Sequence, residues 1–310
     1  MSFTVNLANT RGMCSGVDRA IRVVNIILDK HKNEKVYVYH EVVHNKHVVS
    51  DLAKKGAIFV EHLSDIPNNS VVIFSAHGVG LSTIEKAKSK NLTVIDATCP
   101  LVKRIHRKMN QAAQLGQEAI VIGHKGHQEV IGTVGQYDGD KSLVHVVLTE
   151  DDVKNLEVKT DNLTFATQTT LSVDETVKTV TALKKRFPNI DGPKTDDTCF
   201  ATQLRQNAIK ELSAVSDIII VAGSANSSNS NRLREVAESC GIKAYLVDDA
   251  SNIDLAWLEN VKSVGVSAGA SVPEYVVEEI LAFLKENGAT DINLVGKEDP
   301  ARAFPLPEGC

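Results

Sequence analysis

The sequence predicts an α/β fold of three similar lobes with mostly parallel sheets, arranged with pseudo-threefold symmetry around one centre. Short strands rich in Val and Ile alternate with longer helical stretches along the 310 residues, which is typical of parallel βα units. Three cysteines, Cys14, Cys99 and Cys199, lie 85 and 100 residues apart, each where a strand gives way to a helix. Polar loops recur at similar distances after each cysteine, so we interpret the chain as three repeats.

The cysteines also set the expected domain boundaries. We expect a first lobe over 1–98, a second over 99–195 and a third over 196–283, with the tail 284–310 packing back on the first lobe. The chain is too long for one simple core, and no Pro/Gly/Ser-rich linker divides it.

Apolar periodicity predicts the individual elements. The first strand begins near Phe3, so we expect no targeting segment before it. Later strands are expected over 36–39, 71–74 and 218–223. Helices are expected over 17–28, 45–55, 82–90, 101–115 and 202–215. Three of these helices directly follow the three cysteines.

Composition excludes several classes of protein. The net charge is −5, so no global positive field favours nucleic acid, and any anionic ligand needs a local site. No apolar run approaches the roughly 20 residues of a membrane span. The five cysteines are few and odd in number, which argues against a secreted disulfide framework and favours a reducing, cytoplasmic setting.

The three cysteines are candidate metal ligands. A helix N-terminus favours a thiolate, and three thiolates together form a soft anionic site for iron–sulfur or zinc. Structural zinc usually has four ligands with paired C-x-x-C spacing, which this chain lacks. Three thiolates suit a cubane cluster with one iron left open. The alternative is three small buried side chains, the role we expect for Cys240 and for the terminal Cys310.

Polar residues at strand ends are candidate ligand-binding groups, because parallel sheets bind ligands at the carboxyl ends of their strands. Counted from the preceding cysteine, they are His44 and His77, then His127 and Thr169, then Ser227 and Ser271. The Ser/Asn run 226–231 opens a helix, so its hydroxyl and backbone N–H groups predict an anion nest for a diphosphate. A solvated turn with a helix cap is the alternative.

Glu129 is the only carboxylate in the loop that holds His127. Beside an anionic cluster its pKa would rise, which makes it a candidate proton donor. Thr169 and Thr170 are candidates to relay that proton through a hydroxyl group. The alternatives are an ordinary first-turn acid for Glu129 and strand propensity for the threonines.

Seven motifs in order give the sequence a family resemblance. They are RGMCSGV at 11–17, HEVVHN at 40–45, SAHGV at 75–79, DATCPLV at 96–102, GHQE at 126–129, TQTTLS at 167–172 and NSSNSN at 226–231. With them the chain resembles the 4-hydroxy-3-methylbut-2-enyl diphosphate reductases, from about Asn6 to Ser271 and into the tail. Thr10, Met13 and Ser15 depart from the family's usual Pro, aromatic residue and Ala, but none replaces a ligand.

The resemblance implies a monomer of three α/β lobes around a 4Fe-4S cluster. Cys14, Cys99 and Cys199 would ligate three irons, and the substrate hydroxyl would bind the fourth. The implied diphosphate ligands are His44, His77, Ser227, Asn229 and Ser271, with Ser228 and His127 also in the pocket. The implied catalytic residues are Glu129, His127 and Thr169, with Glu129 supplying protons, helped by Thr169.

The implied reaction is a reductive dehydroxylation that takes two electrons and two protons. It converts (E)-4-hydroxy-3-methylbut-2-enyl diphosphate to isopentenyl and dimethylallyl diphosphate, the last step of the methylerythritol phosphate (non-mevalonate) route. Ferredoxin or flavodoxin would deliver the electrons, ultimately from NADPH. The alternatives are a non-redox iron–sulfur hydro-lyase acting on a phosphorylated hydroxy compound, a zinc hydrolase, and a non-catalytic phosphate-binding or redox-sensing module.

Overall fold

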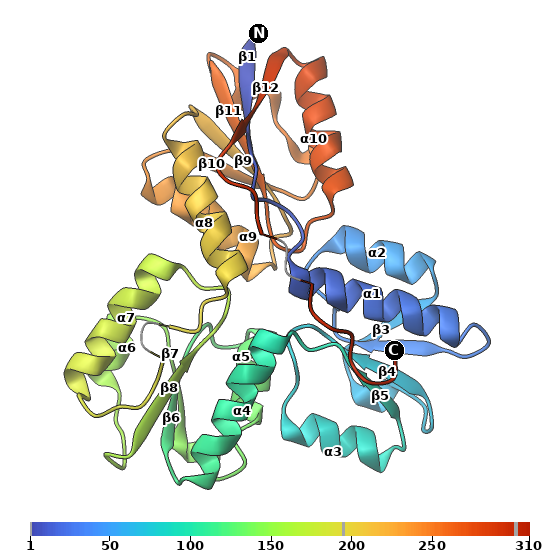
Figure 1. Ribbon diagram of the computed structural model, residues 1–310, viewed down its shortest axis with the longest axis vertical. Helices are drawn as coiled ribbons and strands as arrows, with labels where there is room; N and C mark the ends of the chain where they lie inside the picture. The colour runs from blue at the N-terminus through green and yellow to red at the C-terminus, as the bar shows by residue number, and fades with distance from the viewer. Residues whose placement is uncertain (1, 194–195, 301–302) are drawn as a thin grey trace. The chain divides into compact units, whose positions relative to one another are not determined.

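The computed structural model describes residues 2–193, 196–300 and 303–310. Over these residues the strands form three sheets, and every strand pairing in them is parallel (Figure 1). The predicted α/β class with three mostly parallel sheets is therefore confirmed. None of the helices in this described part of the chain has the length and apolar character that a membrane span needs.

The chain divides into two compact units. The first, called here the five-stranded unit, comprises Met1–Asp18, His44–Asp51 and Phe200–Ala303. The second, called the two-sheet unit, comprises Arg19–Val43, Leu52–Cys199 and Phe304–Cys310. Each unit therefore combines segments that are far apart in the sequence.

One sheet forms the centre of the five-stranded unit. Its order is β10 (Lys243–Val247), β9 (Ile218–Ala222), β11 (Ser263–Ala268), β1 (Phe3–Ala8) and β12 (Ala289–Val295). Alternate residues of β9 point to opposite faces. Ile219 and Val221 pack with helices α8 (Phe200–Ser213) and α9 (Ser228–Ser239), whereas Ile218 and Ile220 pack with α10 (Glu274–Glu286). Both faces are covered, which is why the strand is apolar throughout.

β1 belongs to the range 1–98, which we expected to form the first lobe, but among the described residues it does not pair with the other strands of that range. β1 pairs with β11 on one side and with β12 on the other, placing Val5 beside Val264 and Ile292. The tail 284–310, expected to pack on that lobe, contacts residues of 1–98 at two places: β12 pairs with β1, and the carbonyls of Pro305 and Gly309 accept hydrogen bonds from Arg19 and Lys30 of α1 (Ser15–Lys30). The reason is packing: Val5 and Leu7 are buried in one cluster with Val264 and Val266.

The two-sheet unit contains a four-stranded and a three-stranded sheet. The first has the order β3 (Ala57–Val60), β2 (Val36–Tyr39), β4 (Val71–Phe74) and β5 (Thr93–Asp96). The second has the order β7 (Val144–Val147), β6 (Glu118–Ile122) and β8 (Leu163–Thr167). A parallel bridge from Thr164 to Asp191 extends the second sheet by one position.

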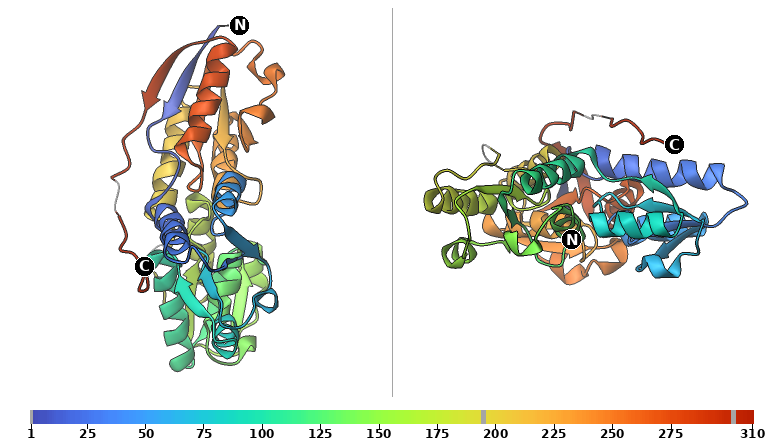
Figure 2. Two further views of the ribbon diagram at one scale, coloured as in Figure 1. Left: turned by 90° about the vertical axis from the view of Figure 1, so that its right-hand side faces the viewer. Right: turned by 90° about the horizontal axis from the view of Figure 1, so that it is seen from below.

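The remaining helices lie close to their expected ranges. They are α1 (Ser15–Lys30), α2 (Lys46–Lys54), α3 (Leu81–Ser89), α4 (Pro100–Gln114), α5 (Gln128–Gly135), α6 (Glu150–Asn155) and α7 (Val173–Arg186). Short 3-10 turns occur at Leu63–Asp65, Lys141–Leu143, Ala250–Asn252 and Leu255–Leu258. The last residues of the chain run along α1, where Lys30 donates to the carbonyl of Gly309 (Figure 2).

A common strand order relates the three sheets. Counted outward from an edge, β10-β9-β11-β1 matches β3-β2-β4-β5, and β7-β6-β8 is followed by the bridge at Asp191. Cys14, Cys99 and Cys199 therefore each follow the fourth position of one sheet, and in the sheet that precedes Cys14 the other four strands come from the C-terminal part of the chain.

Candidate functional site

All three cysteines directly precede a helix, as predicted. Cys14 comes before α1, Cys99 is the N-cap of α4, and Cys199 comes before α8. Their backbone N–H groups donate to the carbonyls of Ala270 at 3.0 Å, Ala76 at 3.0 Å and Thr169 at 3.1 Å, respectively. Each acceptor lies in the loop after the third strand of its sheet. The same local geometry thus holds each thiol at the positive end of a helix.

In the two-sheet unit, α5 packs backbone to backbone against the loop after β4. A Cβ on Gly132 would lie 2.9 Å from the carbonyl oxygen of Gly78, so no larger residue fits without a shift. This close approach places His77 beside His127, with ring centroids 5.9 Å apart and planes nearly perpendicular. Two predicted site residues from different sheets are therefore neighbours.

His127 also begins α5. Its Nδ1 accepts the backbone N–H of Glu129 at 3.1 Å, which caps the helix. In a neutral ring, a nitrogen that accepts leaves the proton on the other nitrogen. His127 therefore presents Nε2 as a hydrogen-bond donor.

Glu129 is buried, with 3% of its surface exposed. One carboxylate oxygen accepts the backbone N–H of Thr169 at 2.7 Å, and the other is 2.9 Å from the Thr169 hydroxyl. Because the carbonyl of Thr169 accepts from Cys199, one threonine connects the carboxylate to a cysteine loop. The two residues predicted to handle protons are thus in direct contact.

The five-stranded unit holds the other predicted binding residues. Ser227 caps α9 by accepting the N–H of Ser230 at 3.3 Å, and Ser228 is the first residue of that helix. The Ser271 hydroxyl donates to the carbonyl of His44 at 2.9 Å. Cys14 lies beside the same loop, because its N–H donates to Ala270.

Asn229 is the most informative side chain in this unit. It is 5% exposed, yet neither its Nδ2 nor its Oδ1 has a partner among the described residues. A buried polar group without a partner costs about 1–3 kcal/mol. A Cβ on Gly269 would lie 3.3 Å from Asn229 Nδ2, so the amide is next to the loop that holds Ser271. This arrangement indicates a polar ligand that Asn229 can bind.

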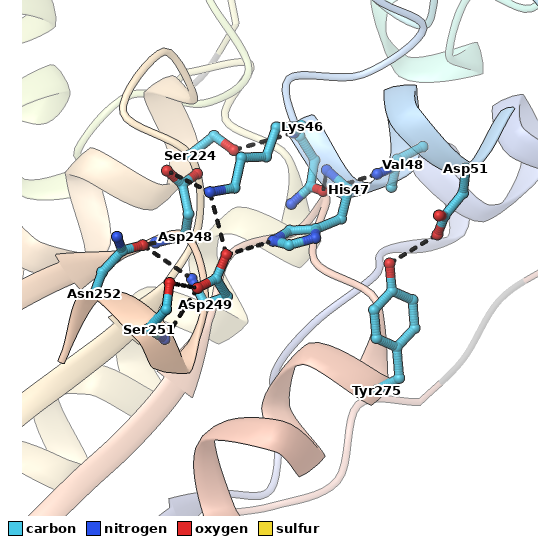
Figure 3. Close-up of polar contacts among 11 residues, drawn as sticks. Lys46, His47, Val48, Asp51, Ser224, Asp248, Asp249, Ser251, Asn252 and Tyr275 are labelled. Carbon is cyan, nitrogen blue, oxygen red and sulfur yellow. Dashed lines mark hydrogen bonds and ion pairs between the residues drawn. The ribbon is translucent and has the colours of Figure 1, made fainter. Parts of the chain in front are cut away.

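Polar contacts fix the segment that carries His44 to the five-stranded unit (Figure 3). The Lys46 N–H donates to the Ser224 hydroxyl at 3.2 Å, and its ammonium lies 3.3 Å from Asp248 and 3.2 Å from Asp249. Burial opposes the charge of Lys46, but the two carboxylates raise its pKa. The ammonium therefore stays charged.

A histidine and a tyrosine complete this attachment. His47 Nε2 is 3.2 Å from Asp249, and the Tyr275 hydroxyl donates to Asp51 at 2.8 Å (Figure 3). Burial, and then the Asp51 carboxylate, raise the pKa of Tyr275, so the phenol stays protonated. His44 is therefore positioned by the five-stranded unit, although β2 of the other unit precedes it in sequence.

The predicted site residues thus fall into two groups. Cys14, His44, Ser227, Ser228, Asn229 and Ser271 are in the five-stranded unit, and Cys99, Cys199, His77, His127, Glu129 and Thr169 are in the two-sheet unit. Within the described ranges, no three or more His, Cys, Asp or Glu side chains form a cation site. The ligand and substrate roles of these residues therefore stay predictions.

Two supporting residues were missed from the sequence. Asn45 is 1% exposed and caps α2 by accepting the N–H groups of His47 and Val48. Gln168 accepts the backbone N–H of His124 at 3.0 Å and so joins the loops after β6 and β8. The Asn before a helical run was a readable cap signal, whereas the Gln168 contact spans 44 residues and had no local signal.

Comparison with known proteins adds independent findings. The family described as LytB protein matches residues 5–285 of this chain. A protein named 4-hydroxy-3-methylbut-2-enyl diphosphate reductase from Aeromonas salmonicida is 55% identical over 283 residues, which is 91% of each chain. Another of that name from Psychromonas ingrahamii is 53% identical over 285 residues, or 92% of this chain and 90% of the relative.

Two solved structures are also similar. The E-1-hydroxy-2-methyl-but-2-enyl-4-diphosphate reductase of Plasmodium falciparum is 35% identical and superposes with a TM-score of 0.92, covering 99% of this chain and 96% of that one. A structure of (E)-4-hydroxy-3-methyl-but-2-enyl diphosphate reductase, described as the terminal enzyme of the non-mevalonate pathway, is 30% identical. Its TM-score is 0.64, with 92% of this chain and 99% of that chain covered.

Proposed function

This chain belongs to the LytB family, and we therefore propose that it reduces (E)-4-hydroxy-3-methylbut-2-enyl diphosphate to isopentenyl and dimethylallyl diphosphate. One structural observation carries the proposal. Each of the three cysteines stands at a helix start and is hydrogen-bonded to the loop that holds a predicted substrate or proton-handling residue. Those residues are Ser271, His77 and Thr169. Each proposed cluster ligand is thus bonded to a loop that would take part in substrate chemistry.

The donor set fits a 4Fe-4S cluster. Cys14, Cys99 and Cys199 would hold three irons, and the other two cysteines are placed differently: Cys240 ends α9 and is exposed, and Cys310 is the last residue. Three thiolates leave one iron without a protein ligand. When bound, the cluster would supply electrons one at a time and a Lewis-acidic iron. Ferredoxin or flavodoxin is the proposed electron donor.

Hydrogen-bond donors of the five-stranded unit would bind the diphosphate. Asn229 Nδ2 has no partner among the described residues, and α9 begins at Ser228 with the positive end of its dipole. His44, Ser227 and Ser271 lie in the adjoining loops, and His77 and His127 would add imidazole N–H groups. Each hydrogen bond to the charged ligand is worth roughly 1.5–3 kcal/mol.

Glu129 and Thr169 would deliver a proton to the leaving hydroxyl. The carboxyl proton moves to Thr169 Oγ1, 2.9 Å away, as the threonine proton moves to the departing oxygen. The C–O bond breaks, the oxygen leaves as water, and two electrons enter the allylic fragment. A second proton, added at one end of that fragment or the other, gives the two products. Each substrate thus consumes two electrons and two protons and gives one isoprenoid diphosphate and one water.

We also propose that the lobes surround the cluster with pseudo-threefold symmetry and that the enzyme acts as a monomer. The repeated strand order and the repeated cysteine-to-loop hydrogen bond support this arrangement. A site enclosed by three lobes would exclude water from the reacting hydroxyl.

The test is an assay on protein purified without oxygen. Iron and acid-labile sulfide are measured, and the hydroxy-diphosphate is added with and without dithionite plus a mediator. We expect close to four irons and four sulfides per chain. Both isoprenoid diphosphates should form only when reductant is present. Turnover without reductant would favour the hydro-lyase, and zinc without sulfide would overturn the cluster.

A further inference from the structure

Each helix that begins after a cysteine carries an arginine five or six residues after that cysteine. Arg19 is five residues after Cys14 on α1, Arg104 is five after Cys99 on α4, and Arg205 is six after Cys199 on α8. None of the three contacts the cysteine that begins its own helix in the bonds described here. Each contacts the segment just before a different cysteine.

Arg205 holds the segment before Cys14. Its side chain is 1% exposed, and its Nε and Nη2 donate to the carbonyl of Gly12 at 3.0 and 2.8 Å. Nη2 also donates to Met13, the residue before Cys14, at 3.3 Å. Asp299 supplies the countercharge at 3.2 Å. A buried guanidinium with this many acceptors fixes the course of the loop.

Arg19 holds the segment before Cys99 in the same way. It is 4% exposed, and its Nη1 donates to the carbonyls of Ala97 at 3.1 Å and Thr98 at 3.2 Å. Its Nε donates to the carbonyl of Pro305 at 2.6 Å. The C-terminal residues thus supply one acceptor to each buried arginine, Asp299 to Arg205 and Pro305 to Arg19.

Arg104 contacts the segment before Cys199. Its Nη2 lies 3.1 Å from a carboxylate oxygen of Asp197. The second oxygen of Asp197 accepts the N–H of Thr167 at 3.3 Å, so Asp197 is tied to the end of β8. Arg104 itself is 60% exposed, which makes this the weakest of the three contacts.

We propose that Arg19, Arg104 and Arg205 are positioning residues whose contacts with the cysteine loops form a closed cycle. In the order Cys14, Cys99, Cys199 and back to Cys14, the helix that starts at one cysteine carries the arginine that fixes the segment before the next. Each guanidinium also places a positive charge next to a cysteine-bearing loop. The statements about a bound cluster rest on the proposed function, whereas the cycle itself rests on the contacts.

Hydrogen exchange of the apoprotein tests the cycle without a cluster. The N–H groups of Gly12 and Cys14 donate to Ala268 and Ala270, so their exchange reports on that loop. Arg205→Met should accelerate their exchange by about tenfold through local opening and leave the Cys99 and Cys199 amides within about twofold. Arg19→Met should accelerate the Cys99 amide in the same crossed manner, and Arg104→Met should change the Cys199 amide only slightly.

The matched control is Arg107→Met, an exposed arginine of α4, which should leave all three loops unchanged. Acceleration that is uniform along the chain, or confined to the cysteine that starts the mutated helix, would overturn the cycle. Arg205→Lys keeps the charge but cannot bond several carbonyls at once, so it should give an intermediate rate. Wild-type exchange in that variant would also contradict the proposal.

Measurements on the reconstituted cluster separate the effect of the Arg205 charge from the effect of its hydrogen bonds. In reconstituted protein, Arg205→Met should release iron to a chelator about tenfold faster and shift the midpoint potential to more negative values. Arg205→Lys should restore the potential but not the iron retention, which a purely structural role would not produce. If the wild type holds no cluster, the proposed function fails while the exchange rates still decide the cycle.

Discussion

The two units carry their site residues in opposite states. In the five-stranded unit, Asn229 is buried with both amide atoms unpartnered. In the two-sheet unit, Glu129 is equally buried, but Thr169 occupies both of its carboxylate oxygens. The unpartnered amide of Asn229 can bind a polar ligand, whereas the carboxyl group of Glu129 is already oriented by its hydrogen bonds to Thr169. Under the proposed function, the five-stranded unit would supply most of the substrate-binding groups and the two-sheet unit the proton-transfer groups.

Glu129→Gln should have the largest effect on turnover. The amide keeps the shape and can still bond Thr169, but it cannot donate a proton to the leaving hydroxyl. We expect kcat to fall by about 10²–10⁴-fold with KM within a few fold, measured by dithionite-driven turnover. Glu150→Gln, an exposed acid of the same unit, is the control. Normal kcat in Glu129→Gln would remove the proton role from the two-sheet unit.

Acid should destabilise the two-sheet unit through His106. Burial lowers the pKa of this histidine, on α4 beside Gly78, to about 4. Between pH 6.5 and 4 the unfolded chain binds the proton and the folded chain does not, so stability falls as the pH falls through this window. The loss is on the order of 2–3 kcal/mol.

Urea unfolding at pH 7 and pH 5 measures this effect. His106→Phe should remove part of the stability difference between the two pH values, even if its stability at pH 7 is lower. His31→Phe, one residue after the end of α1 and only partly buried, serves as the control. An unchanged pH dependence in His106→Phe would show that another group causes the loss.

Asn229→Leu should move binding and stability in opposite directions. A leucine of similar size removes an unsatisfied buried amide, so the apoprotein should gain about 1 kcal/mol in unfolding free energy. Substrate KM should rise by about tenfold, because a hydrogen bond to the diphosphate is lost. Urea unfolding and steady-state kinetics measure the two effects, with Asn293→Leu on exposed β12 as the control. Lower stability together with unchanged KM would contradict the binding role.

Asp249→Asn should have the smallest effect. It weakens the contacts of Lys46 and His47 that hold the His44 segment to the five-stranded unit. We expect KM to rise about threefold with kcat unchanged, since a partly exposed ion pair contributes about 0–1 kcal/mol. The exposed Asp291→Asn is the matched change. Equal KM values in the two variants would show that this attachment does not position His44.

The sequence predicted the local structure around the site closely. The helices expected from 17, 101 and 202 begin at 15, 100 and 200, directly after the three cysteines, and the strand expected over 218–223 is β9, Ile218–Ala222. These features depend on apolar periodicity and helix caps, which act over a few residues. The strand near Phe3 was also found, but its sheet was not, because an apolar strand can pair with any sheet that buries it.

By itself, the sequence determined the three cysteine-to-helix junctions, the parallel α/β class and the candidate loops, since each is encoded by neighbours in the chain. Only the tertiary structure decided that β1 joins strands more than 200 residues away, that Arg205 holds Gly12, and that Asn229 is buried without a partner. The physical reason is that these features depend on which surfaces pack together, and packing leaves no signal at a fixed spacing in the chain.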